Sequence, residues 1–158
     1  VFIPVDGFQA PEMQGVEVTG GQLTTVTFTY EEDQLTSSLE TWRQDNFGTI
    51  LNSGLAADVA DPDKDGVTNI DEYTAGTDPK NSTDFLKFST AIKTGTTFSA
   101  ECAGKSGRIY VLQRNTELDG EWTSVSSQGP LTAGGTVLLT DDSAPAGASY
   151  YRIEVSMP

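Results

Sequence analysis

Histidine is absent from this chain, and cysteine occurs only once, at Cys102. Without histidine, serine–histidine and cysteine–histidine nucleophiles are excluded, as are hydrolytic metals held by histidine. A lone cysteine cannot form an internal disulfide, and on a strand it is expected to be a small buried apolar residue. We therefore expect a non-catalytic protein that is not stabilised by disulfides. A carboxylate pair for glycoside hydrolysis stays open, because acidic residues are plentiful.

Basic residues are also scarce, with 9 lysines and arginines against 23 aspartates and glutamates and a net charge of −14. Such a surface repels nucleic acid and anionic lipid. No apolar run approaches the roughly 18 consecutive residues of a membrane-spanning helix. The sequence therefore predicts neither nucleic acid as a partner nor a membrane span.

The most specific feature is the stretch DPDKDGVTNIDE at residues 61–72. It places carboxylates at positions one, three, five and twelve, glycine at six and asparagine at nine, which is the spacing of a twelve-residue calcium loop. We predict a bound calcium ion with these ligands: Asp61, Asp63, Asp65, the carbonyl of Val67, Asn69 directly or through water, and Glu72 in bidentate fashion.

The spacing has a physical reason, since three carboxylates on one tight loop repel one another unless a cation lies between them. Gly66 would supply the sharp turn, because glycine adopts backbone angles that other residues resist. The alternative is a solvated acidic turn without metal. Magnesium is disfavoured because it prefers octahedral, water-rich sites, and zinc because no histidine is present.

Three segments follow along the chain: 1–32, 33–84 and 85–158. The first contains an alternating stretch at Val16 and Val18, a Gly20-Gly21 turn and a threonine-rich strand over 23–30. A hairpin of this size does not fold alone. We expect these strands either to pack on their own chain or to pair with another molecule, giving protein partners or self-assembly.

In the middle segment, residues 33–84, the sequence predicts a helix, the calcium loop and a second helix. Ser37 followed by Glu40 is a capping-box signal, and Gly48 should end the first helix. The second helix is expected from Asn69 to Ala75, with Gly76 as its cap.

The last segment predicts an all-β unit, because short strands alternate with turn signals as they do in β-sandwiches. The expected strands are 85–91, 97–102, 108–114, 122–126, 136–139 and 150–155. The residues expected in the core or at its edge are Tyr110, Leu112, Trp122, Val125, Leu139, Tyr151 and Ile153.

Four stretches carry a resemblance: TWRQDNFG, AADVADPDKDGVTNIDEYTAGTDP, YVLQRNTELDGEWTSV and SYYRIEV. Together they resemble the C-terminal regions of large secreted proteins of Verrucomicrobia- and Planctomycetes-type bacteria, over roughly residues 40–157 and more weakly over 1–30. Those regions join a calcium loop, similar to thrombospondin type 3 and dockerin loops, to a small immunoglobulin-like β-sandwich. The resemblance implies a mainly β fold of that kind and the same calcium ligands. Only one complete loop is present, so a dockerin or a calcium sensor is not expected.

These observations predict a calcium-stabilised structural, adhesion or assembly module of a secreted bacterial protein. A structural calcium site suits an extracellular setting, so we expect a secreted or cell-surface location. The alternative is a carbohydrate-binding module of a secreted polysaccharide-degrading enzyme, with Trp122, Tyr110 and Tyr150 as candidates for stacking on a glycan.

Overall fold

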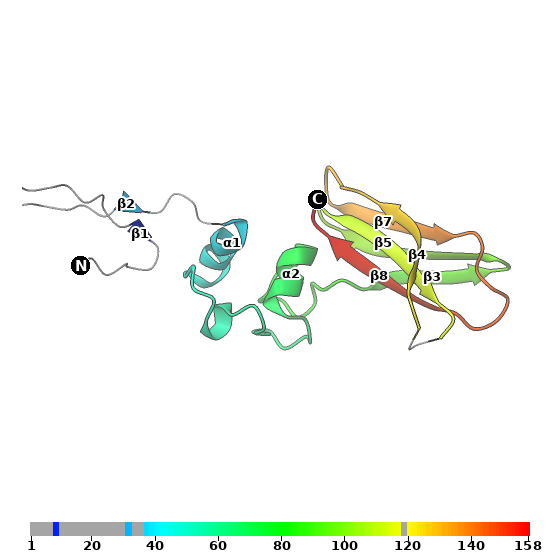
Figure 1. Ribbon diagram of the computed structural model, residues 1–158, viewed down its shortest axis with the longest axis horizontal. Coiled ribbons are helices and arrows are strands. Elements are labelled where there is room, and N and C mark those ends of the chain that lie inside the picture. Colours follow the sequence, from blue (N-terminus) through cyan, green and yellow to red (C-terminus); the bar gives the residue numbers. More distant parts are fainter. Residues whose placement is uncertain (1–7, 10–30, 33–36, 118–119) are drawn as a thin grey trace, which may run out of the picture. The chain divides into compact units, whose positions relative to one another are not determined.

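The computed structural model describes residues 8–9, 31–32, 37–117 and 120–158 (Figure 1). The chain divides into two compact units, Val1–Asn52 and Ser53–Pro158. The predicted helix–loop–helix segment spans their boundary, with the first helix in one unit and the loop and second helix in the other.

In the first unit, β1 (Phe8–Gln9) pairs antiparallel with β2 (Glu31–Glu32). The predicted strands at Val16 to Val18 and over 23–30 lie outside the described residues.

Helix α1 (Ser38–Phe47) has the predicted ends. The Ser37 hydroxyl accepts a hydrogen bond from the Glu40 backbone N–H at 3.2 Å, and the Glu40 carboxylate accepts one from the Ser37 N–H at 2.6 Å. This reciprocal capping box satisfies two amides at the start of the helix. At the other end Gly48 adopts a left-handed conformation with φ 72°. Both cap predictions are confirmed.

The second unit begins with the short 3₁₀ helix η1 (Gly54–Ala56) and continues through the acidic loop into α2 (Asn69–Ala75). Helix α2 has the predicted bounds and ends at Gly76, which is left-handed with φ 78°. None of the helices in the described part of the chain has the length and apolar character that crossing a bilayer requires.

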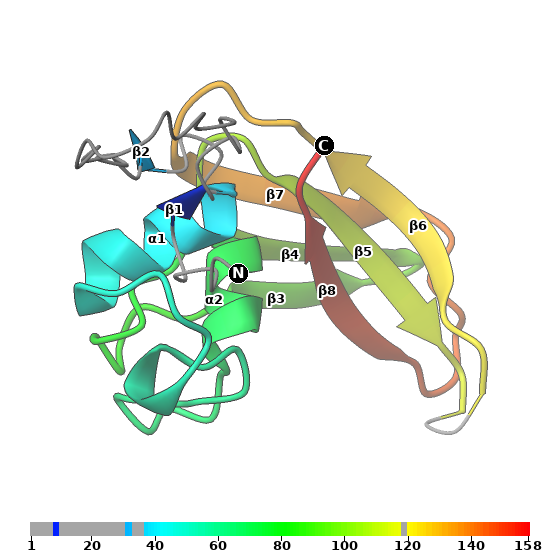
Figure 2. The same ribbon diagram turned by 60° about the vertical axis from the view of Figure 1, so that its left-hand side comes forward.

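Six strands form the rest of the second unit and make the fold mainly β. They are β3 (Phe88–Thr94), β4 (Thr97–Gly104), β5 (Ile109–Asn115), β6 (Thr123–Gln128), β7 (Gly135–Asp141) and β8 (Tyr150–Ser156). They form two antiparallel sheets, ordered β3-β4-β7 and β6-β5-β8. Figure 2 shows the two sheets as separate layers.

Each of the six predicted strands has a counterpart, and β3 shows the largest shift. The prediction placed it at 85–91, whereas its ladder with β4 runs from Phe88 to Thr94. Thr94 pairs directly with Thr97, so the hairpin turn is only two residues long. Gly95, with φ 61°, permits this tight turn, and the strand therefore extends further than its apolar residues indicated.

The two sheets share one hydrophobic core. Its buried centre consists of Cys102, Tyr110, Leu112, Val137 and Leu139, with Val125, Tyr151 and Ile153 among the residues packed against it. Cys102 is buried on β4, which confirms the prediction that it is a small buried residue of a strand. Trp122, predicted in the core or at its edge, lies outside this cluster and is half-buried beneath the Arg152 guanidinium, 4.4 Å from the ring centre.

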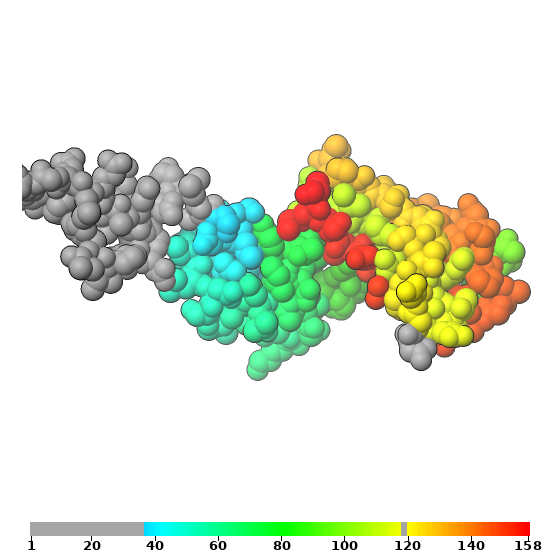
Figure 3. Space-filling model, viewed as in Figure 1, coloured from blue at the N-terminus to red at the C-terminus, as the bar shows by residue number. Residues whose placement is uncertain are grey.

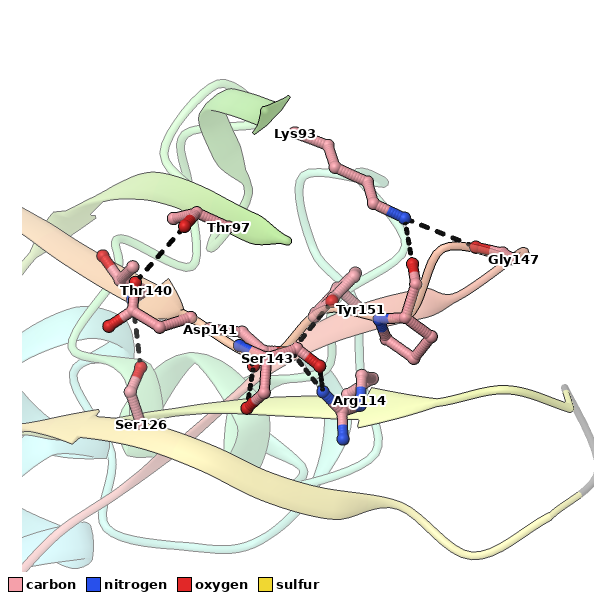
Figure 4. Close-up of polar contacts among 11 residues, drawn as sticks. Lys93, Thr97, Arg114, Ser126, Thr140, Asp141, Ser143, Gly147 and Tyr151 are labelled. Atoms are coloured by element: carbon pink, nitrogen blue, oxygen red, sulfur yellow. Dashed lines mark hydrogen bonds and ion pairs between the residues drawn. The ribbon is translucent and has the colours of Figure 1, made fainter. Parts of the chain in front are cut away.

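A polar network crosses between the sheets at one end of this core (Figure 4). The buried Asp141 of β7 accepts hydrogen bonds from Arg114 Nη1 of β5 at 2.6 Å and from the Tyr151 hydroxyl of β8 at 2.9 Å. The Tyr151 ring in turn stacks on Phe98 of β4, with ring centres 3.7 Å apart. The Asp141 carboxylate thus connects β7 of one sheet to β5 and β8 of the other.

The protonation state of Asp141 should affect stability at acidic pH. Burial raises the pKa of this carboxyl, but hydrogen bonds from Ser143, Tyr151 and Arg114 outweigh burial and leave the pKa below its ordinary value. A group whose pKa is lowered by folding stabilises the fold above its unfolded pKa of about 3.9 and loses that effect as pH falls.

We therefore expect wild type to be more stable than Asp141→Asn at neutral pH, by about 1–3 kcal/mol. The difference should shrink as pH falls below about 4. Urea unfolding of both proteins between pH 7 and pH 3 measures it. A difference that stays constant with pH would contradict this role of the Asp141 charge.

Candidate metal centre

The acidic loop brings its three aspartates together. One carboxylate oxygen each from Asp61, Asp63 and Asp65 lies within 4.8 Å of the others, and all three side chains are half-buried. This is the only such group of metal-ligating side chains found among the described residues. The sequence predicted these three residues as a cluster, and the fold of the loop does place them together.

Backbone amides of the loop itself hold the carboxylates in place. Asp61 accepts from the N–H groups of Lys64 at 2.8 Å and Gly66 at 2.9 Å, while Asp63 accepts from Asp65 N–H at 3.2 Å. Asp65 accepts from the N–H of Val67 at 2.8 Å. These bonds curl the chain so that alternate side chains converge. The curl requires positive φ angles at Lys64 (65°) and Gly66 (94°).

Helix α2 adds two deeply buried polar side chains to the loop. Asn69 is 1% exposed and Glu72 is 0% exposed. Four buried side-chain oxygens of this region have no hydrogen-bond partner within the described part of the chain: Asp63 Oδ2, Asp65 Oδ2, Asn69 Oδ1 and Glu72 Oε2. Buried acceptors are normally satisfied, so four orphans in one loop require an explanation.

The electrostatics of the centre are unfavourable in the protein alone. Burial raises the pKa of Glu72 to about 7, and the charges of Asp63 and Asp65 add to the effect. Burial also raises the pKa of Asp63, partly opposed by the Asp65 N–H, and the charges of Asp65 and Asp61 contribute. The side-chain atoms of Asp61, Asp63, Asp65, Asn69 and Glu72 that could bind a metal are all oxygens. Oxygen ligands are the kind that a hard divalent cation prefers.

Asn69 makes contacts that the sequence did not reveal. Its Nδ2 donates to the carbonyls of Leu55 and Ala57, both at 2.8 Å, and its backbone N–H donates to Ala60 O at 2.9 Å. Backbone carbonyl acceptors carry no side-chain signature, so no pattern in the sequence identifies this contact.

Helix α2 is also tied to the β-strands of its own unit. Arg108, next to β5, donates from Nη2 to the Tyr73 carbonyl of α2 at 2.8 Å. Beyond the helix, both carboxylate oxygens of Asp84 accept from Lys105 Nζ, at 2.9 and 2.8 Å. Helix α2 also contacts β8, and Figure 3 shows the red C-terminal strand against the green helical region. These contacts attach the acidic loop to the sheets.

The three aromatic residues proposed for glycan stacking have different environments. Tyr110 is buried in the core, and its hydroxyl accepts from the Lys105 N–H at 2.7 Å. Its prediction as a core residue is confirmed, and its ring is not exposed for stacking on a glycan. Trp122 has one ring face against Arg152. Tyr150 is 39% exposed at the start of β8.

Comparisons with known protein families, curated proteins and solved structures gave no match for this chain.

The positive φ of Gly66 gives a prediction about the loop. A Cβ at this position would meet no atom within 4 Å, so the cost of Gly66→Ala is conformational and about 1–2 kcal/mol. Gly147 is an equally uncrowded loop glycine that lacks a positive φ, so Gly147→Ala is the matched control. Chemical denaturation of both variants measures the difference. Equal stability of the two would contradict the assigned loop conformation.

Proposed function

We propose that residues 61–72 bind one calcium ion and that the protein is a non-catalytic, calcium-stabilised module of a secreted bacterial protein, acting in adhesion or assembly. The observation that carries the proposal is the set of four buried, unpartnered oxygens in the loop and at the start of α2. A cation would give these atoms a partner and offset the repulsion among the carboxylates.

The choice of calcium follows from the number and kind of the proposed ligands. Calcium accepts about 6–8 oxygen ligands in flexible geometry, whereas magnesium keeps several waters in an octahedral shell. The proposed ligands are the carboxylates of Asp61, Asp63, Asp65 and Glu72, the amide oxygen of Asn69 and the carbonyl of Val67. This set is rich in protein oxygens and leaves little need for water. Calcium is therefore the best match.

The attachment of α2 to the sheets supports a structural role. Glu72 lies on α2, and the Tyr73 carbonyl of this helix accepts a hydrogen bond from Arg108, the residue before β5. The Glu72 carboxylate also accepts from the Thr77 hydroxyl at 3.3 Å, just beyond the helix. An ion bound at Glu72 would hold the loop and the helix against the β-strands, which we propose form an immunoglobulin-like sandwich.

Calcium removal tests this proposal. At a calcium concentration a hundredfold above Kd, binding to the folded state alone adds about 2.7 kcal/mol, or about 10 °C in Tm for a unit of this size. We expect scanning calorimetry to show such a loss when a chelator is added and its recovery when calcium is restored. An unchanged melting curve would reject a stabilising ion.

Glu72→Gln separates the ion from the fold, because it removes a buried charge while keeping the shape of the side chain. Without calcium, we expect Tm to rise by about 2–4 °C, since repulsion from the aspartates falls. With calcium, most of the stabilisation seen in wild type should be lost.

Asp71→Asn is the matched control for that variant. It makes the same charge change on the same helix, but Asp71 is exposed, is bonded to the Thr68 hydroxyl and is not a proposed ligand. We expect its calcium response to match that of wild type. Equal responses in both variants would show that Glu72 is not a ligand.

A further inference from the structure

The segment from residue 53 to residue 60, which we call the strap, runs alongside the beginning of α2. It contains η1 and starts at the boundary between the two units. Three backbone hydrogen bonds within the strap each span three residues. Its bonds to α2 fix its position beside that helix.

That attachment depends mainly on Asn69. The side-chain amide nitrogen donates both of its hydrogens to the strap, one to Leu55 O and one to Ala57 O. The backbone N–H of Asn69 donates to Ala60 O, and that of Ile70 donates to Asp58 O at 3.1 Å. Two successive residues of α2 thus make four bonds to the strap.

The orientation of the Asn69 amide follows from these bonds. Carbonyl oxygens can only accept, so the amide nitrogen must face the strap and Oδ1 must face away from it. This oxygen is buried and has no partner within the described residues. Asn69 therefore presents its oxygen as the only side-chain atom available to a cation.

We propose that Asn69 couples calcium binding to the order of the strap, as a ligand through Oδ1 and as an anchor through Nδ2. The inference rests on the proposed calcium site. Coordination of Oδ1 fixes the plane of the amide, and the same plane directs Nδ2 at Leu55 O and Ala57 O. Polarisation of the amide by a cation also makes its N–H groups stronger donors.

The coupling has a consequence at the surface. The strap carries two exposed aliphatic side chains, Leu55 at 69% and Val59 at 83%. Calcium would hold the backbone that presents them, and it would fix the point where the second unit begins. Calcium removal would release this segment first, before the sheets lose structure.

Hydrogen–deuterium exchange of the full chain, followed by mass spectrometry, tests the coupling. With calcium, we expect the strap amides of Ala56, Ala57 and Ala60 to exchange at least tenfold more slowly than with a chelator. The turn at 78–84 is the internal control, because it holds backbone hydrogen bonds of the same kind beyond the other end of α2. If calcium slows amide exchange equally in the strap and in the turn, the ion stabilises the protein in general, and the coupling is overturned.

Asn69→Asp tests the amide directly. Aspartate keeps an oxygen for the ion but loses both donors and places an oxygen against the carbonyls of Leu55 and Ala57. At a calcium concentration that calorimetry shows to saturate this variant, we expect the calcium-dependent protection of the strap to disappear. Thr68→Ala is the neighbouring control, because the Thr68 hydroxyl contacts Asp71 and not the strap.

The outcomes separate the coupling from the proposed function. If wild type binds no calcium, the proposed function fails. If wild type binds calcium and is stabilised but its strap exchanges at the same rate with and without the ion, only the coupling fails. Strap protection in Asn69→Asp equal to that in wild type would also reject the coupling. If that variant does not fold, the wild-type comparison alone decides.

Discussion

The structure depends on the burial of a carboxylate beside two others. Glu72 is fully buried on α2, and the charges of Asp63 and Asp65 raise its pKa further above the ordinary value. Burying like charges together is among the most unfavourable arrangements in a protein, and it persists only where something compensates for it. Within the described residues, four buried oxygens of this region lack a hydrogen-bond partner, and they mark where the compensation is missing. The proposed ion supplies it.

The β-strands give this centre a firm support. The hydrophobic core joins the two sheets, and the Asp141 network connects them again at one end. Arg108 immediately precedes the central strand β5, so its bond to Tyr73 O connects α2 to the middle strand of a sheet and not to an edge strand. The loop is therefore held at its helical end by the fold. The strap, which leads into the other end of the loop, is bonded to Asn69 of the same helix.

Much of this arrangement could be predicted from the sequence, because it arises from local chemistry. The ligand spacing of residues 61–72, the capping box at Ser37 and the glycine caps at Gly48 and Gly76 all act within a few residues. Such signals predicted both helices and the clustering of the aspartates. The six strands followed from short β-type stretches separated by turn signals, with errors of a few residues where a tight turn extended the ladder.

The remaining features depend on contacts between distant residues. The strap is recognised through backbone carbonyls, which every residue carries, so nothing marks Leu55 or Ala57 as acceptors. The ion pair between Arg114 and Asp141 joins positions that only the folded topology brings together. Trp122, predicted as a core or core-edge residue, packs under Arg152 outside the core cluster. Tyr110, considered for glycan stacking, is buried at the centre of the core.

The central claim is that one calcium ion satisfies the buried oxygens of the loop. The most direct measurement is anomalous X-ray diffraction from crystals grown with calcium, at a wavelength where calcium scatters anomalously. The account predicts a single strong peak among Asp61, Asp63 and Asp65, with Asn69 Oδ1 and Glu72 Oε2 at about 2.3–2.6 Å from it. A loop without a peak, or a peak that leaves Glu72 uncoordinated, would contradict it.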